Sequence, residues 1–182
     1  MRSINHWYIA LLVVCLCCAR QSWATVIVRF DPSDKTVDRN IEPTFTVDIV
    51  ADIPDPVVGW GLDLTIDDPA IISQVGAPAI GSQWSAGSAP DGDRLVGVAF
   101  PNSISGTDIL LATITFSADA LGETDLLLSI TPADLTEGFP LDPTGFADVT
   151  FEAGHVTVVP EPITLALLAV GSLVPLNRRR RQ

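Results

Sequence analysis

The sequence predicts an all-β fold, an antiparallel β-sandwich that occupies residues 25–159 of the 182-residue chain. Apolar residues in this region alternate with polar ones, which is the period of strands with one buried face. Clusters of proline, glycine and aspartate interrupt the alternation and predict turns. No segment of the region has a helical period sustained over several turns. These observations together favour a sandwich over a helical or mixed domain.

About eight or nine short strands are expected, each with one apolar face turned inward. In chain order, their inward residues are Val26, Val28 and Phe30; Phe45, Val47 and Ile49; Trp60, Leu62, Leu64 and Ile66; Val96, Val98 and Phe100; Leu110, Ala112, Ile114 and Phe116; Leu126, Leu128 and Ile130; Ala147, Val149 and Phe151; Val156 and Val158.

Residues 1–24 are predicted to be a signal peptide. Arg2 precedes an apolar run over residues 7–19, and Ser22 and Ala24 place small residues before a cleavage site after Ala24. A lipoprotein signal is the alternative, because Cys15, Cys17 and Cys18 lie in the run; the residue before each of them is not small, which disfavours it. The mature domain would then contain no cysteine, so disulfides and cysteine-ligated metals are excluded.

Residues 160–182 form a tail with three consecutive parts. Pro160, Glu161 and Pro162 come first, and residues 163–176 are an apolar run with only two polar side chains. As a helix, this run would span about 21 Å, less than the ~30 Å of a bilayer core. The basic residues that follow can reach the headgroups and satisfy the positive-inside rule, which favours a short transmembrane helix. These residues are Arg178, Arg179, Arg180 and Arg181.

The tail resembles the PEP-CTERM sorting signal of exported bacterial proteins. The resemblance implies an exosortase-type sorting enzyme as a partner, with Pro160, Glu161 and Pro162 as the recognised signature. It also implies an intermediate anchored in the inner membrane, followed by display at the cell surface or release. Ile163 departs from the family pattern, in which serine or threonine follows the signature; Thr164 comes one position later. A plain C-terminal membrane anchor remains the alternative.

The domain between the two ends is strongly acidic. Residues 25–159 hold four basic residues, Arg29, Lys35, Arg39 and Arg94, against 21 acidic ones, a net charge of −17. Such a domain repels phosphate backbones, so nucleic acid is excluded as a partner.

Four segments of the domain resemble a cohesin domain in their order and pattern: residues 44–50, 58–72, 110–116 and 120–128. Residues 90–101 are also similar to cohesin-like domains of exported proteins. The resemblance implies a jelly-roll-like sandwich of the carbohydrate-binding-module superfamily. It further implies a non-catalytic module that binds a protein (dockerin-like) or polysaccharide partner. A structural component of an extracellular matrix or biofilm is the alternative.

Residues 25–159 contain two tryptophans, Trp60 and Trp84. Trp60 alternates with Leu62 and Leu64, which predicts a place in the core. Trp84 lies in a loop without alternation, so it is a candidate partner contact; the alternative is that it covers one end of the sandwich.

No catalytic residue, metal site or cofactor is predicted. Asp63, Asp67 and Asp68, and likewise Asp91 and Asp93, are close in sequence, but they lack the spacing of a calcium-binding loop; calcium stays an open alternative. His155 is expected on the solvated side of the last strand. A glycoside hydrolase needs only two carboxylates, and it remains the less favoured alternative to a binding module.

Overall fold

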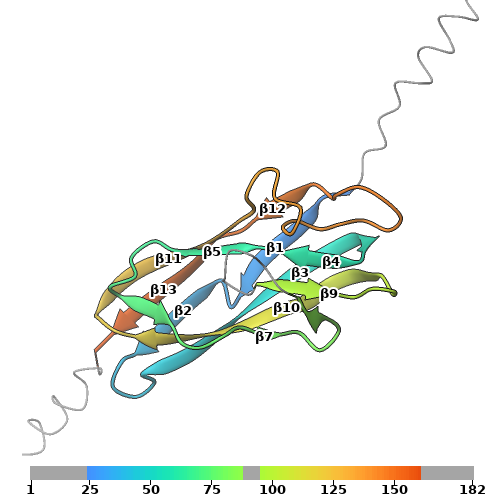
Figure 1. The fold of residues 1–182 in the computed structure, drawn as a ribbon. Helices are drawn as coiled ribbons and strands as arrows, with labels where there is room; N and C mark the ends of the chain where they lie inside the picture. The colour runs from blue at the N-terminus through green and yellow to red at the C-terminus, as the bar shows by residue number, and fades with distance from the viewer. Residues whose placement is uncertain (1–23, 88–94, 161–182) are drawn as a thin grey trace, which may run out of the picture.

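The computed structural model describes residues 24–87 and 95–160, which fold as the predicted all-β sandwich (Figure 1). The strands of this part are β1 (Val26–Asp31), β2 (Asp34–Asp38), β3 (Thr44–Val57), β4 (Gly59–Gly61), β5 (Asp63–Ile66), β6 (Ile72–Gln74), β7 (Ala79–Ile80), β8 (Ser85–Ala86), β9 (Val96–Val98), β10 (Ile104–Ala118), β11 (Gly122–Ser129), β12 (Val149–Phe151) and β13 (Gly154–Val159).

The strands form two main sheets and one small sheet. The first sheet has the order β12-β1-β3-β10-β6, with β7 also paired to β10, and the second has the order β2-β13-β11-β5. The small third sheet has the order β4-β9-β8. Most neighbours are antiparallel, as expected, but β1 with β12 and β13 with β2 are parallel pairs.

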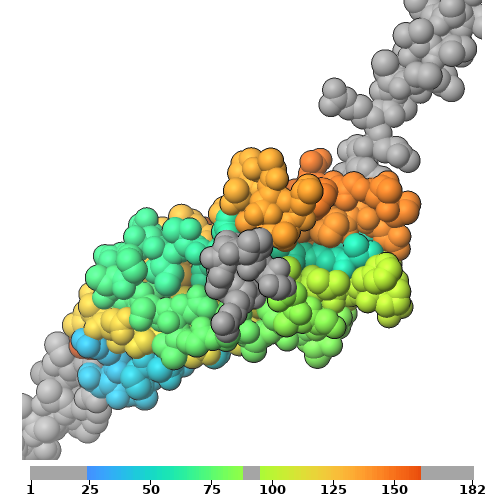
Figure 2. Space-filling model, in the orientation of Figure 1, coloured from blue at the N-terminus to red at the C-terminus, as the bar shows by residue number. Residues whose placement is uncertain are grey.

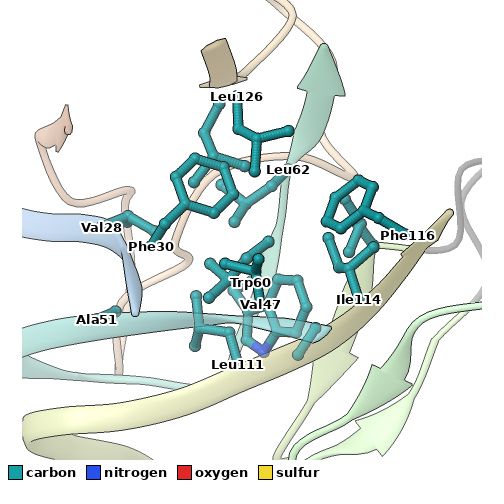
Figure 3. Packing of buried hydrophobic residues seen from close by; sticks show 14 of the residues in the cluster. Val28, Phe30, Val47, Ala51, Trp60, Leu62, Leu111, Ile114, Phe116 and Leu126 are labelled. Carbon is teal, nitrogen blue, oxygen red and sulfur yellow. The ribbon is translucent and has the colours of Figure 1, made fainter. Parts of the chain in front are cut away.

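The core fills the space between the sheets. Figure 3 shows Phe30 of β1 beside Leu126 of β11, and Ile114 beside Phe116, both of β10. All four belong to one buried cluster, so both main sheets contribute to the core. Burying a side chain of this size stabilises the fold by about 1.5–3 kcal/mol. The predicted inward alternation is confirmed in β1, in the first half of β3, in β11 and in β13.

The prediction is wrong in four places, at Leu110, Val98, Phe100 and Ile130. Within β10 the pairing register shifts between Leu110 and Ala112, so Leu111 is fully buried and Leu110 only half-buried. Val98, the last residue of β9, is 40% exposed, and Phe100, which lies beyond the end of β9, is 77% exposed. Ile130 is exposed because β11 ends one residue before it.

The described chain enters and leaves the domain at opposite ends (Figure 1). β13 lies between β2 and β11, and its last residue, Val159, pairs with Asp38. We call the surroundings of Pro160, made of the turns 38–43 and 118–122, the tail-exit end, and the opposite end the far end.

The predicted leader before Ala24 and the tail after Pro160 lie outside the described residues. In residues 24–87 and 95–160, no helix has the length and hydrophobicity needed to span a membrane.

Candidate partner-binding surface

An apolar groove of about 300 Å³ lies over the third sheet. It is formed by β4, β8 and β9 together with the loop between β11 and β12. Its lining residues are Val58, Gly59, Trp60, Gly87, Val96, Gly97, Val98, Phe100, Leu135, Thr136 and Pro140. Figure 2 shows the segments around residue 100 and residues 131–147 at the far end of the surface.

Glycines permit the close packing beneath this groove. β4 pairs with β9 so that Trp60 stands opposite Gly97. A Cβ atom on Gly97 would lie 2.4 Å from the Trp60 Nε1 atom and would clash with it, so the Trp60 ring can lie here only because residue 97 is a glycine. A Cβ atom on Gly61 would lie 2.1 Å from the Thr136 carbonyl oxygen. The loop after β11 can therefore lie directly on β4, where Gly61 and Gly138 exchange backbone hydrogen bonds of 3.0 and 2.8 Å.

That loop is fixed by its own carboxylates. Glu137 is buried, and its Oε2 atom accepts a hydrogen bond from the Thr131 backbone N–H. The Asp134 carboxylate accepts from the Thr136 side chain (2.7 Å) and backbone (2.8 Å), and these bonds hold the pKa of Asp134 below its usual value. Leu135, which lies between Asp134 and Thr136 in the sequence, is 82% exposed. The loop thus presents an apolar side chain on a constrained backbone.

Phe100 and Leu135 are two large apolar side chains that line one groove and are both largely exposed. Isolated exposed apolar residues are common on protein surfaces. A cluster of them around a concave apolar surface instead marks an interaction site. This surface can bury apolar groups of a partner.

The structure corrects the expectation for Trp84. Its side chain is 6% exposed, its Nε1–H donates to the Leu110 carbonyl oxygen (3.0 Å), and its ring packs edge-on against Trp60 at 6.3 Å. Trp84 is therefore part of the core rather than a contact for a partner, and the Leu110 oxygen satisfies its one polar group. Trp60 is buried, as predicted.

The described residues contain no group of three or more histidine, cysteine, aspartate or glutamate side chains placed to hold a metal ion. Asp68 instead accepts from the Ala70 N–H in a turn (3.0 Å), and Asp63 accepts from the Thr131 hydroxyl (3.0 Å). Asp91 and Asp93 lie outside the described ranges.

His155 lies on the outer face of the second sheet, as predicted. Its Nδ1 atom is 2.7 Å from the Asp125 carboxylate, and its Nε2 atom is 4.0 Å from that of Glu123. The hydrogen bond to Asp125, with the charges of Asp125, Glu123 and Asp34, raises the pKa of His155. This is a surface ion pair rather than a cleft with facing catalytic groups.

Of the predicted sorting signature, the structure describes only Pro160, which is exposed and directly follows β13. Glu161, Pro162 and the four arginines of the tail lie beyond the described residues.

The family comparison identifies a PEP-CTERM protein-sorting motif over residues 158–181, and no enzyme family is among its matches. This confirms the resemblance of the tail. The motif implies an exported protein that an exosortase sorts to the cell surface. No curated protein matches the chain.

Solved structures similar to the domain are cohesins. A non-cellulosomal cohesin from Archaeoglobus fulgidus has a TM-score of 0.53 at 16% identity, covering 79% of this chain and 97% of its own. A cohesin in a cohesin–dockerin complex from Clostridium thermocellum also has 0.53, at 10% identity, covering 78% and 98%. A Ruminococcus flavefaciens ScaB cohesin bound to a dockerin has 0.53 at 12% identity, covering 77% and 99%. The chain therefore joins a domain of cohesin-like fold to a PEP-CTERM sorting motif.

Proposed function

We propose that this protein is a non-catalytic, surface-displayed module that binds a protein partner in the groove at its far end. The observation that carries the proposal is the apolar groove itself, with Phe100 and Leu135 exposed at its rim. The fold supports it, because several of the similar cohesins are seen in complexes with dockerins. A dockerin-like protein is therefore the first partner to test.

The arrangement of the two ends supports display of the groove. The tail leaves the domain at one end, and the groove lies toward the other. The 14-residue strand β3 runs along this axis and spans about 46 Å at ~3.3 Å per residue. A domain held at the envelope by its tail would present the groove away from the point of attachment.

The surface favours a protein over a polysaccharide. The tryptophans of residues 25–159, Trp60 and Trp84, are both buried, so neither can stack on a sugar ring, and Phe100 is the one aromatic side chain exposed among the lining residues of the groove. The groove is largely apolar, which suits leucine-like or aromatic side chains of a partner. The net charge of −17 on residues 25–159 further favours a partner with basic residues around its apolar contact.

The experiment is capture of partners from extracellular material by the immobilised protein, followed by titration of the captured protein. Leu135→Asp and Phe100→Ser should each weaken binding about tenfold or more, because a few side chains that become buried at the centre of an interface carry most of its binding energy. Leu127→Ser is the matched control, since Leu127 is 41% exposed on the outer face of the second sheet.

Equal binding by the groove variants and the control would refute the groove as the site. Binding to a polysaccharide panel alone would favour the glycan alternative. Binding to neither class would favour a structural matrix component, and release of sugar from the panel would favour the glycoside hydrolase.

A further inference from the structure

We propose that the tail-exit end of the domain rests on the lipid surface of the membrane through Ile41 and Leu121. The inference rests on the proposed insertion of residues 163–176 into that membrane and is independent of the groove. It adds a second contact surface to the protein, at the opposite end from the first.

Two large apolar side chains flank the point where the tail leaves. Ile41 is 71% exposed and Leu121 is 52% exposed. Their turns are joined by a hydrogen bond from the Ala118 N–H to the Pro43 carbonyl oxygen (2.9 Å). Figure 2 shows these turns, in light blue and yellow, beside the end of the described chain.

The register of β13 fixes this arrangement. Val158 pairs with Gly122, next to Leu121, and Val159 pairs with Asp38, whose carbonyl oxygen accepts from the Ile41 N–H (3.1 Å). Each apolar side chain therefore stands in a turn that is bonded to the last residues of β13. Pro160 emerges between the two turns.

The link between the domain and the apolar run is short. From Val159 to Ile163 there are four residue steps, which reach about 14 Å at most when fully extended. The headgroup layer on each side of a bilayer is itself about 5–8 Å thick. If residues 163–176 enter the hydrocarbon, the tail-exit end is held at the level of the headgroups.

The link cannot lengthen by releasing β13. This strand is hydrogen-bonded to β2 on one side and β11 on the other, and the Val159 carbonyl oxygen accepts from the Arg39 N–H (3.1 Å). Its side chains Val156 and Val158 are buried in the core. Peeling it away would open the second sheet at its centre.

The net charge of this end is small compared with that of the whole domain, because its two turns carry Asp38, Glu42 and Asp119 against Arg39, and Lys35 adds a second basic side chain next to them. Lys35 lies 3.5 Å from Glu42. Hydrogen bonds from Ser73 and Ser117 lower the pKa of the Asp119 carboxyl, and the charge of Arg39 makes a smaller contribution in the same direction. Lys35 and Arg39 are two of the four basic residues in the range 25–159, and both belong to the tail-exit end. These basic side chains lower the electrostatic cost of bringing the acidic domain to a lipid surface at this end.

A lipid surface fits better than a protein partner. Ile41 and Leu121 are exposed in turns, whereas Phe100 and Leu135 line a groove at the far end. Two side chains give a weak contact, but a tether of four residues keeps the surface at a high effective concentration. A weak lipid contact therefore suffices.

The test uses residues 25–182, which contain no cysteine, reconstituted in phosphatidylcholine vesicles without other proteins. The variants Ile41→Cys, Leu121→Cys and Leu135→Cys are each labelled at the new thiol with a polarity-sensitive fluorophore, and a brominated lipid serves as the quencher. Leu135 is the matched control, because it is a leucine that is even more exposed but lies away from the tail. Vesicle flotation measures tail insertion separately.

We expect blue-shifted, quenchable emission at positions 41 and 121 and water-like emission at position 135. The double variant Ile41→Ser, Leu121→Ser should float as well as the unsubstituted protein. On vesicles, however, the backbone amides of residues 38–43 and 118–122 should exchange hydrogen for deuterium faster than in that protein. Flotation with water-like emission at all three positions would overturn this proposal while leaving tail insertion standing. Failure to float would overturn both. A shift that requires an added sorting enzyme would reveal a protein interface instead.

Discussion

Replacing Trp60 and Trp84 separately by phenylalanine isolates the contribution of one hydrogen bond. Both indoles are buried and pack against each other edge to face, so the two substitutions remove the same atoms from one cluster. The two indoles differ in the hydrogen bonding of their N–H groups. The Trp84 Nε1–H donates to the Leu110 carbonyl oxygen, whereas the Trp60 Nε1–H has no hydrogen-bond partner in the described part of the chain.

The magnitudes follow from that difference. Loss of packing should cost both variants about 2 kcal/mol. Trp84→Phe additionally breaks a hydrogen bond and leaves the Leu110 oxygen without that donor, about 1–2 kcal/mol more. Trp60→Phe removes an unpartnered buried donor and recovers about 1 kcal/mol. The free energy of unfolding should therefore fall by about 3–4 kcal/mol for Trp84→Phe and only about 1 kcal/mol for Trp60→Phe.

Urea titration followed by far-ultraviolet circular dichroism measures both values, provided that the two variants keep the wild-type dependence on urea. Equal destabilisation, or a larger loss for Trp60→Phe, would refute the reasoning. It would mean that the Trp60 N–H has an acceptor, such as an ordered water, and that packing alone determines the cost.

Three further predictions follow. Gly97→Ala should lower the free energy of unfolding by about 1–3 kcal/mol in a urea titration, because its Cβ would clash with the Trp60 ring; an unchanged midpoint would contradict the packing described. For His155, the folded-state pKa lies above the ordinary 6.5, so its stabilisation is present below pH 6.5 and is lost as the pH rises through the raised value. The stability difference between wild type and His155→Gln should therefore be largest in mild acid and disappear in alkali, and nuclear magnetic resonance titration of Asp125→Asn should show a lower His155 pKa. Glu161→Gln should leave the exported chain full-length in the membrane, and normal processing of this variant on an immunoblot would reduce the tail to an anchor.

The sequence predicted those parts of the fold that depend on a two-residue period. The alternation of Val26, Val28 and Phe30 is local information, and a strand with one buried face has to show it. The bulge that turns Leu111 inward arises from pairing between β10 and β3, which no local pattern records. β2, β6, β7 and β8 were not anticipated, because they are two to five residues long and carry few apolar side chains.

The candidate surface was harder to predict than the fold. Phe100 continues the alternation of Val96 and Val98, which predicts a place in the core, but β9 ends at Val98 and both Val98 and Phe100 are exposed. Leu135 and Glu137 lie in a loop without periodicity, so their opposite exposures had no sequence signal. The glycines flanking Trp60 were the available clue, since closely spaced glycines in strands indicate close approach of another backbone.

Exposed apolar side chains have different expected roles at the two ends of this domain, because the tail distinguishes those ends. Leu135 and Leu121 are both exposed leucines in loops, and neither sequence nor exposure separates them. Their positions relative to Pro160 separate them. Leu121 lies in a turn next to the end of β13, which leads to Pro160, whereas Leu135 lines the groove at the opposite end of the domain. Leu135→Ser should therefore reduce partner capture without changing vesicle contact, and Leu121→Ser should do the converse. If both variants lost the same activity, the two surfaces would not be separate, and the assignment of one end to the membrane and the other to a partner would fail.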